Sequence, residues 1–377
     1  MRVALFSEVF LPKIDGVVNT VCYLLKHLAE RGHEAVLFTA GDGPTSYAGT
    51  PVLRRNGIPF LPYPPVELVL PIVDLSDDLE SFAPDVVHAI NPVALGLAGM
   101  WWSRREAVPV VASYHTDVAG FAARWGLGVL QEPIWLFFRW VHDQADLNLC
   151  PSRVTLAELQ TRGFPRLKVW TRGVDTVRFS PKHRSEEWRW RLSGGRPDAP
   201  LLLYVGRVSP EKRVDWLRPV LAELPEACLA IVGDGPARPV LEEAFAGTRT
   251  VFTGFLYGEH LAQAYAAADV FVFPGANETL GNVVLEAMAS GLPVVTPRAG
   301  GPLDLVEDGV TGLFFEPEDP SSMLECVRWL LMEPLYASDI ARAAREYALG
   351  RSWNTVLDGL LDDYATLVDS YVLEAVA

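Results

Sequence analysis

The sequence predicts an α/β protein with two domains, each built around a doubly wound parallel sheet. At 377 residues, the chain is longer than one ordinary hydrophobic core supports. Short apolar runs without polar alternation recur along it, and such runs are typical of strands buried on both faces of a parallel sheet. The runs alternate with segments of helical periodicity and form two series, with a break near residues 173–200. Each series therefore predicts a Rossmann-like domain.

The first domain is predicted over residues 1–173. It opens with an apolar strand at residues 2–6 and a loop, followed by a helix at residues 17–31 whose apolar side chains repeat at helical spacing. Gly32 ends this helix. Further strands are predicted at residues 34–39, 85–89, 108–113 and 146–150. Strand, helix and strand in this order form the repeating unit of a doubly wound sheet.

The second domain is predicted over residues 174–350. Residues 182–200 are rich in charge, Gly and Pro, which is typical of a connection outside a sheet. New strands are predicted at residues 200–206, 227–232, 250–253, 269–273 and 292–296. Parallel sheets bind ligands at the carboxyl ends of their strands, so the two domains are expected to face each other across a cleft.

The end of the chain, residues 351–377, predicts a helix from Trp353 to about Val372. One apolar stripe at helical spacing contains Val356, Leu360, Leu361, Tyr364, Leu367, Val368 and Tyr371. The acidic residues expected largely on the other face are Asp358, Asp362 and Asp369. An apolar stripe of this length requires a partner surface.

Composition and charge exclude several classes of protein. The net charge of −15 argues against nucleic acid as a partner, because phosphate backbones are bound by basic patches. Residues 1–173 carry 15 Lys and Arg against 17 Asp and Glu, and residues 174–377 carry 17 against 30, so contact with an anionic surface is better placed in the first half. The start does not resemble a signal peptide and no apolar run is long enough to cross a membrane, so a cytoplasmic protein is expected. Neither a zinc site nor a disulfide framework is expected from the widely spaced Cys22, Cys150, Cys228 and Cys326.

The strongest motif lies in residues 277–297, where seven residues separate Glu278 from Glu286. A helix is expected from about Leu280 to Ser290, and eight helical steps rise about 12 Å. Two glycosidase carboxyl groups would lie only about 5–9.5 Å apart, so the pair is expected to hold two parts of one elongated ligand. Glu278 would bind sugar hydroxyls and Glu286 ribose hydroxyls, although a helix carboxylate can also be merely solvated. A diphosphate would be bound by the helix N-terminal amides of Thr279, Leu280 and Gly281.

These residues resemble the E-x7-E signature of glycosyltransferase family 4, and the resemblance covers nearly the whole chain. It implies the GT-B fold and retaining transfer of a sugar from a nucleotide diphosphate sugar. In the family, the second sheet opens with a strand that ends in Gly-Arg and is followed by Lys, here Gly206, Arg207 and Lys212. Fixed cations there stabilise the departing diphosphate, while a surface salt bridge is the alternative for Arg207. The resemblance also implies that the terminal helix crosses back to the first domain, with hinges near Gly173 and Gly350.

The first domain contributes two further candidates. Gly16 follows Asp15 in FLPKIDGVVN, and its N–H lies at a helix start where it can bind phosphate, whether or not Asp15 also caps the helix. His115 in SYHTD matches the active-site histidine of the family near the donor sugar, while a structural histidine is the alternative. Asp117 departs from the His or Asn of related sequences, so no role is assigned to it.

The turn GDGP at residues 233–236 is not a dinucleotide fingerprint, because Arg238 stands where a third glycine is needed. It resembles the turn after the second strand of the family's nucleotide domain. The loop TGFLY at residues 253–257 is expected to border the base through backbone groups of Phe255 or Leu256.

No metal and no cofactor besides the donor, a GDP-sugar or UDP-sugar, is expected. Asp77-Asp78 and Asp362-Asp363 do not lie at strand ends, and Arg207 and Lys212 already supply positive charge. No carboxylate is placed as a nucleophile, so the resemblance implies retention on one face of the sugar, with the departing phosphate helping to deprotonate the acceptor.

Two groups within the family are similar to this chain. FLPKIDGVVNTV and NVVLEAMASGLPVVTPRAGGPLDLV resemble bacterial GDP-mannose-dependent mannosyltransferases, while RSEEWRWRLSGGRPDAPLLLYVGR resembles sulfoquinovosyl diacylglycerol synthases. Transfer of a hexose, mannose first, to a membrane lipid or glycolipid is therefore favoured. The alternative is sulfoquinovosyl or glucosyl transfer from a UDP-sugar to diacylglycerol, with Lys13 beside a sulfonate.

Trp and Arg side chains gather in residues 101–105 and 121–142. This composition is typical of a membrane interface, here at the inner face of the cell membrane through residues 101–142, or of an ordinary core helix with a cationic edge. Two functions of other classes stay open, a sugar-nucleotide epimerase of GT-B fold and a non-catalytic nucleotide-sugar binding protein.

Overall fold

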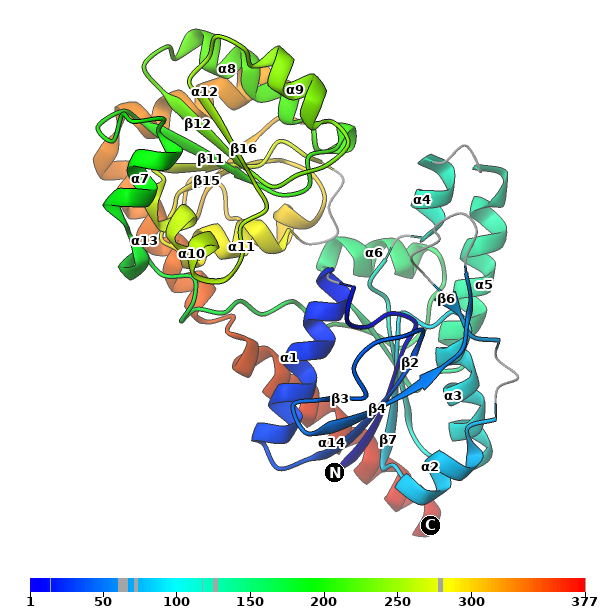
Figure 1. Cartoon of the computed structure of the whole chain (residues 1–377). Helices are drawn as coiled ribbons and strands as arrows, with labels where there is room; N and C mark the ends of the chain where they lie inside the picture. The colour runs from blue at the N-terminus through cyan, green and yellow to red at the C-terminus, as the bar shows by residue number, and fades with distance from the viewer. Residues whose placement is uncertain are drawn as a thin grey trace. The chain divides into compact units, whose positions relative to one another are not determined.

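A computed structural model describes residues 1–13, 15–59, 67–70, 74–116, 118–124, 128–276 and 281–376. The chain divides into two compact units (Figure 1). Unit 1 consists of Met1–Arg172 together with Asn354–Ala377, and unit 2 consists of Gly173–Trp353. The end of the chain therefore belongs to the same unit as its beginning.

Unit 1 contains an eight-stranded sheet in the order β10-β9-β8-β7-β1-β2-β4-β3. The pairs are parallel except β3 with β4, which is antiparallel. The strands are β1 (Arg2–Ser7), β2 (Glu34–Ala40), β3 (Ser46–Tyr47), β4 (Thr50–Arg55), β7 (Val86–Ile90), β8 (Val110–Ser113), β9 (Leu147–Cys150) and β10 (Leu167–Val169). A separate antiparallel pair is formed by β5 (Ile58–Pro59) and β6 (Glu67–Leu68).

The five strands predicted for the first domain are confirmed as β1, β2, β7, β8 and β9. The predicted series lacks β3, β4 and β10. All three strands lie toward the edges of the sheet and carry partly exposed residues, so their sequences are not continuously apolar.

The helices of unit 1 cover both faces of its sheet. Successive residues of a strand point to opposite faces, so neighbouring residues of one strand contact different helices. On β7, Val87 packs in a buried cluster with Leu95 and Ala98 of α3. The next residue, His88, points the other way and contacts Tyr364 of α14. The helices are α1 (Gly16–Glu30), α2 (Ser76–Phe82), α3 (Leu95–Arg105), α4 (Val118–Arg124), η1 (Gly128–Leu130), α5 (Gln131–Asp143), α6 (Arg153–Thr161) and α14 (Trp353–Val376).

Helix α14 packs along unit 1 beside α1 (Figure 1). Its buried side chains are Leu357, Leu360, Leu361 and Tyr364. The expectation that Asp358 lies largely on the face away from the partner surface is wrong. Its carboxylate bonds to His27 Nε2 at 2.8 Å and to Arg31 Nη2 at 2.5 Å, both on or next to α1. A carboxylate at the edge of the buried face is retained there because two basic side chains meet it.

Unit 2 contains a six-stranded parallel sheet in the order β13-β12-β11-β14-β15-β16. The strands are β11 (Leu201–Val205), β12 (Cys228–Val232), β13 (Thr250–Gly254), β14 (Val270–Val272), β15 (Val294–Pro297) and β16 (Leu313–Phe315). The α-helices are α7 (Glu186–Leu192), α8 (Leu217–Glu223), α9 (Arg238–Ala244), α10 (Gly258–Ala267), α11 (Asn282–Ala289), α12 (Pro320–Met332) and α13 (Pro334–Leu349). Short 3-10 helices are η2 (Pro181–His183), η3 (Pro210–Lys212), η4 (Val214–Trp216) and η5 (Gly301–Asp304).

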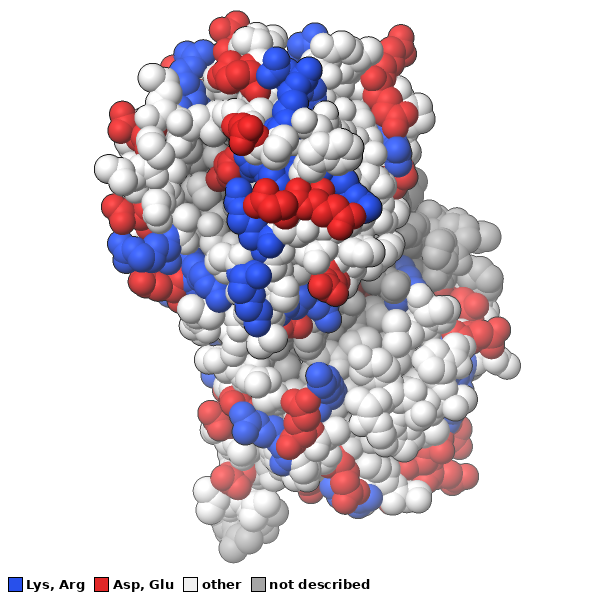
Figure 2. Space-filling view, turned by 60° about the vertical axis from the view of Figure 1, so that its left-hand side comes forward, with Lys and Arg blue, Asp and Glu red and all other residues white. Residues whose placement is uncertain are grey.

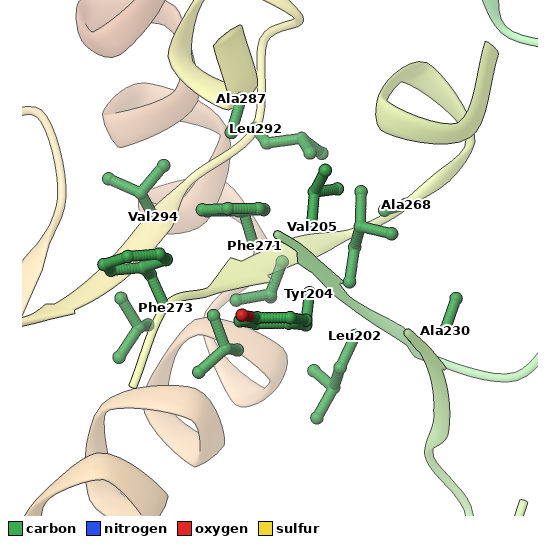
Figure 3. Close-up of a cluster of buried hydrophobic side chains, with 14 of the residues drawn as sticks. Leu202, Tyr204, Val205, Ala230, Ala268, Phe271, Phe273, Ala287, Leu292 and Val294 are labelled. Carbon is green, nitrogen blue, oxygen red and sulfur yellow. The ribbon is translucent and has the colours of Figure 1, made fainter. Parts of the chain in front are cut away.

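The core of unit 2 is built on aromatic side chains from its central strands (Figure 3). The Tyr204 and Phe273 rings stack with centroids 6.4 Å apart, and the Phe271 and Phe273 rings stack at 6.5 Å. All three residues are buried. The five predicted strands are confirmed as β11 to β15, while β16 is missing from the predicted series. Residues 182–200 lie outside the sheet as predicted, but they include α7.

On the face drawn in Figure 2, Lys and Arg side chains are interspersed with Asp and Glu side chains over the described residues. Among the described residues, neighbours of opposite sign form ion pairs, such as Arg298 with Asp308 at 2.6 Å. Mixed charge of this kind differs from the continuous basic stripe that binds a nucleic acid.

Candidate functional site

The carboxyl end of β11 meets the GDGP turn through a close approach of two backbone segments. Gly206 N–H bonds to Val232 O at 3.0 Å, and Val208 N–H bonds to Asp234 O at 3.0 Å. A Cβ added to Gly233, whose φ is 134°, would lie 1.9 Å from Gly206 O. The glycine therefore allows the turn to pack directly on the strand end that leads to Arg207.

The two candidate cations of unit 2 follow β11. Arg207 is exposed, and its carbonyl accepts a hydrogen bond from the Tyr204 hydroxyl at 2.8 Å. Lys212 ends η3, and its Nζ lies 5.7 Å from the centre of the Phe273 ring. A Cβ on Gly275 would touch Lys212 Cα at 3.3 Å, so Lys212 lies beside the segment that leads into residues 277–280.

The E-x7-E motif is described only in its second half. Glu278, Thr279 and Leu280 lie outside the described residues. The expectation that the helix begins near Leu280 is corrected, because Gly281 has a φ of 91° and α11 begins at Asn282. A left-handed residue cannot continue a helix, so Gly281 is its N-cap.

Glu286 lies half-buried on α11 and is held by a residue that the sequence analysis missed. The Tyr265 hydroxyl of α10 donates a hydrogen bond to Glu286 Oε2 at 2.9 Å. Burial raises the pKa of Glu286 to about 7, although the Tyr265 hydroxyl and the charge of Arg178 favour the ionised form. A solvated surface carboxylate would not have this environment. Among the described residues none donates a hydrogen bond to the other oxygen, Oε1, which can therefore accept from a ligand.

The loop after β13 presents Phe255 to solvent with 56% of its surface exposed, and its ring stacks with that of Tyr257 at 6.2 Å. Leu256 packs partly on the core of unit 2. The exposed aromatic pair offers a flat apolar surface at the loop where the base is predicted to bind.

In unit 1, Gly16 is the first residue of α1. Asp15 caps this helix, and its Oδ1 accepts hydrogen bonds from Val17 and Val18 N–H, both at 2.9 Å. Lys13 Nζ forms an ion pair with Asp15 Oδ2 at 3.2 Å. The capping interpretation of Asp15 is confirmed, and Gly16 lies at the helix N-terminus as predicted.

His115 follows β8 and is buried, with 6% of its surface exposed. Its Nε2 bonds to Ser113 Oγ at 2.8 Å and its Nδ1 bonds to Arg172 Nη2 at 3.0 Å. Burial, together with the charge of Arg172, lowers the pKa of His115 well below its usual value. The imidazole is therefore neutral, and both of its nitrogens are already engaged by the protein.

Arg172 links His115 to the first turns of α1. Its Nη1 donates to Thr20 Oγ1, which in turn donates to Gly16 O at 2.8 Å. Burial lowers the pKa of Arg172 to about 10, which leaves the guanidinium charged at neutral pH. The side chain of Arg172 thus connects the two candidate residues of unit 1, Gly16 and His115.

A cavity of about 190 Å³ opens near the ends of β1 and β2, and its lining includes Glu8, Lys13, Asp42 and Glu67. Glu8 is buried, and its Oε1 accepts hydrogen bonds from the N–H groups at the start of α3, including Ala94 at 2.8 Å. Burial raises the pKa of Glu8 even though these N–H groups favour its ionised form. Its observed contacts are those of a helix cap.

In the part of the chain that the structure describes, no three His, Cys, Asp or Glu side chains are grouped to hold a metal ion. None of the described helices is long and apolar enough to cross a membrane.

Residues 14–178 match the family described as Glycosyltransferase Family 4, and residues 199–333 match Glycosyl transferases group 1. A GDP-mannose-dependent alpha-mannosyltransferase of Mycobacterium tuberculosis is 42% identical over 372 residues, which cover 97% of this chain and 96% of the relative. The chain belongs to glycosyltransferase family 4.

This family-4 glycosyltransferase has further relatives. The sulfoquinovosyl transferase SQD2 of Arabidopsis thaliana is 38% identical over 361 residues, which cover 93% of this chain and 71% of the relative. The solved structure of sucrose-phosphate synthase from Thermosynechococcus elongatus superposes with a TM-score of 0.79 at 22% identity. The match covers 98% of this chain and 99% of the synthase chain. The glycosyltransferase therefore has the GT-B fold.

The residues that hold the candidate groups of this glycosyltransferase in place were not predicted from its sequence. Tyr265 lies on α10 among alanines, where the sequence predicts only that an aromatic side chain packs in the core. Arg172 follows β10, which was itself not predicted. His88 and Ser113 lie inside apolar strand runs, and a polar residue there is the signal that could have found them.

Proposed function

We propose that this glycosyltransferase moves a hexose, with mannose favoured, from a nucleotide diphosphate sugar to a membrane lipid or glycolipid. The observation that carries the donor is the 42% identity, over nearly the full length of both chains, to a GDP-mannose-dependent alpha-mannosyltransferase. The 38% identity to a sulfoquinovosyl transferase supports the second candidate, sulfoquinovosyl transfer to diacylglycerol.

In the proposed mechanism, unit 2 binds the nucleotide part of the donor. Glu286, held by Tyr265, accepts hydrogen bonds from the ribose hydroxyls. The N-terminus of α11 at Gly281 and the side chains of Arg207 and Lys212 face the diphosphate, whose charge grows as the glycosidic bond breaks. These fixed charges take the part that a divalent ion plays elsewhere, so transfer proceeds without metal.

Unit 1 supplies Gly16 for the phosphate and His115 for the sugar in the proposed mechanism. His115 acts as a neutral, immobile group, because its two ring nitrogens are engaged by Ser113 and Arg172. The proton of the acceptor hydroxyl therefore passes to the departing phosphate, on the same face of the sugar, and the anomeric configuration is retained.

The acceptor is proposed to reach the enzyme from a lipid surface that contacts α3 and α5. These helices expose an aromatic cluster of Trp101, Leu136, Phe137 and Trp140, between 37% and 62% exposed. The Trp101 and Trp140 rings lie 6.4 Å apart, so the cluster is continuous between the two helices. Exposed Trp side chains are typical of a membrane interface, and α3 ends with Arg104 and Arg105.

The donor is tested by incubating the purified protein with GDP-mannose, UDP-glucose or UDP-sulfoquinovose and vesicles that contain dioleoylglycerol or a monohexosyl diacylglycerol. Acceptor-dependent release of GDP and an α-linked product, identified by NMR, are expected. Turnover of UDP-sulfoquinovose alone would select the second candidate. Release of an epimerised sugar nucleotide, or donor binding without any turnover, would contradict transfer.

The lipid surface is tested by sedimentation with phosphatidylglycerol vesicles. A Trp101→Ala, Trp140→Ala double variant is expected to bind these vesicles more weakly than the wild type. The matched control replaces two exposed tryptophans of unit 2, Trp190 and Trp329, which are 59% and 45% exposed. Equal binding by both double variants would contradict a contact through α3 and α5.

A further inference from the structure

The hydrogen-bond partners of His115 determine which of its nitrogens carries the proton. A guanidinium has only donors, so Nδ1 of His115 accepts the hydrogen bond from Arg172 at 3.0 Å. A neutral imidazole has one proton, which then lies on Nε2 and is donated to Ser113 Oγ at 2.8 Å. The ring is thus fixed in one tautomer and one orientation.

Ser113 is held in turn by residues far from it in the sequence. Its Oγ lies 2.9 Å from His88 Nε2, and His88 Nδ1 lies 2.5 Å from the hydroxyl of Tyr364 on α14. All three residues are fully buried, and burial lowers the pKa of His88 to about 3, so this imidazole is also neutral. The chain of hydrogen bonds runs from α14 through β7 and β8 to His115.

Trp170 packs against both histidines of this chain of hydrogen bonds. Its ring meets the His88 ring edge-on at 5.7 Å and the His115 ring edge-on at 5.5 Å. Both imidazoles are therefore packed as well as hydrogen-bonded, and a small change at one of them is transmitted to the other.

We propose that Tyr364 of the C-terminal helix is a positioning residue for His115, acting through His88 and Ser113. The proposal rests on the proposed function, in which His115 lies beside the donor sugar. A phenylalanine would fill the same space, so packing alone does not call for the hydroxyl. The hydroxyl instead anchors His88, which holds the serine that accepts the hydrogen bond from His115 Nε2–H. The terminal helix thereby helps to form the candidate site of unit 1.

The first test compares Tyr364→Phe with Asp358→Asn. Tyr364→Phe removes only the anchoring hydroxyl, so kcat is expected to fall about two- to tenfold, the effect of one buried hydrogen bond, with the acceptor KM unchanged. Asp358→Asn weakens the docking of α14 on His27 and Arg31 but leaves the hydrogen bonds from Tyr364 to His115 intact. It therefore lowers the melting temperature and leaves kcat unchanged. Equal kcat in Tyr364→Phe and the wild type would overturn the proposal.

A double-mutant cycle shows whether Tyr364 acts through Ser113. The effects of Tyr364→Phe and Ser113→Ala on kcat are expected to be less than additive, because either change breaks the same chain. The effects of Asp358→Asn and Ser113→Ala on the melting temperature and on kcat are expected to add. Fully additive effects of Tyr364→Phe and Ser113→Ala on kcat would show that the tyrosine acts by another route.

A measurement without turnover separates this inference from the proposed function. The chain has seven histidines, so ¹⁵N-histidine labelling gives a resolvable set of ring signals, and His115→Asn identifies those of His115. We expect protonated Nε2 and bare Nδ1 for His115 in the wild type, and shifted or broadened His88 ring signals in Tyr364→Phe. Protonated Nδ1 on His115, or unchanged His88 signals, would overturn the inference even if the protein transfers mannose. The expected spectra in a protein without transferase activity would refute only the proposed function.

Discussion

At Gly233 the backbone takes a φ of 134°, and an added Cβ would lie 1.9 Å from Gly206 O. The sequence alone marks GDGP as a turn, but it does not show that the turn presses on the strand end before Arg207. Backbone strain and steric overlap each cost about 1–3 kcal/mol. The glycine is therefore required by geometry on both counts.

Gly233→Ala is expected to lower the free energy of unfolding by about 2–6 kcal/mol, since strain and overlap add. Urea denaturation followed by circular dichroism measures this. Gly247→Ala is the matched control, because its φ is 77° but no atom lies within 4 Å of the added Cβ. A loss no larger in Gly233→Ala than in Gly247→Ala would contradict the close approach.

Glu286→Ala is expected to raise the dissociation constant of the donor nucleotide tenfold or more, because charge-assisted hydrogen bonds contribute about 1.5–3 kcal/mol each. The pKa of about 7 adds a dependence on pH. Below pH 7 the free protein holds Glu286 protonated, and a donor that needs the carboxylate must displace that proton. Affinity should therefore rise as pH increases through about 7. Calorimetry from pH 5.5 to 8.5 measures the dissociation constant of the donor. In Glu286→Gln this constant should no longer depend on pH. Equal slopes in both proteins would remove Glu286 from the nucleotide site.

At the scale of elements, continuous apolar runs predicted the central strands of both sheets, because a strand buried on both faces leaves no room for polar side chains. Strands β3, β4 and β10 were not predicted, since partial exposure lets polar residues enter. Strand β16 was also missed, although its sequence LFF is apolar and mostly buried, because three residues are too few to form a recognisable run. The candidate residues His115 and Glu286 could be placed from motifs. Their supports, Tyr364 and Tyr265, could not, because a buried tyrosine at helical spacing looks the same whether its hydroxyl is used or not.

Removal of α14 should unfold unit 1 although it leaves the sheet sequence intact. A stop after Trp353 deletes four buried side chains, Leu357, Leu360, Leu361 and Tyr364, each contributing about 1.5–3 kcal/mol. That sum is comparable to the whole stability of a domain. Soluble yield and binding of a hydrophobic dye measure the effect. The control is a stop after Val372, which retains these contacts and should behave as the full chain. A soluble, cooperatively melting protein truncated after Trp353 would show that α14 is dispensable.

At the scale of the molecule, the charge is unevenly distributed. Residues 174–377 carry 17 Lys and Arg against 30 Asp and Glu, yet this half contains the strand end where Arg207 and Lys212 follow β11. Under the proposed mechanism, this acidic half of the sequence binds an anionic diphosphate through local cations and helix dipoles rather than through net charge. Donor binding should therefore weaken with salt less steeply than binding to an extended basic surface.

The last prediction concerns the source of positive charge during transfer. Under the proposed mechanism, Arg207 and Lys212 stabilise the leaving diphosphate, so activity should survive excess EDTA. Arg207→Ala should lower kcat about 10²–10³-fold, the usual effect of removing one fixed group that stabilises the transition state. The control is Arg342→Ala on α13, an exposed cation paired with Asp339, which should leave kcat unchanged because surface ion pairs contribute little. Initial rates of the wild type and the two variants, with and without EDTA, test this prediction. Complete loss of wild-type activity in EDTA, restored by magnesium or manganese, would show that a metal ion, and not these side chains, neutralises the leaving group.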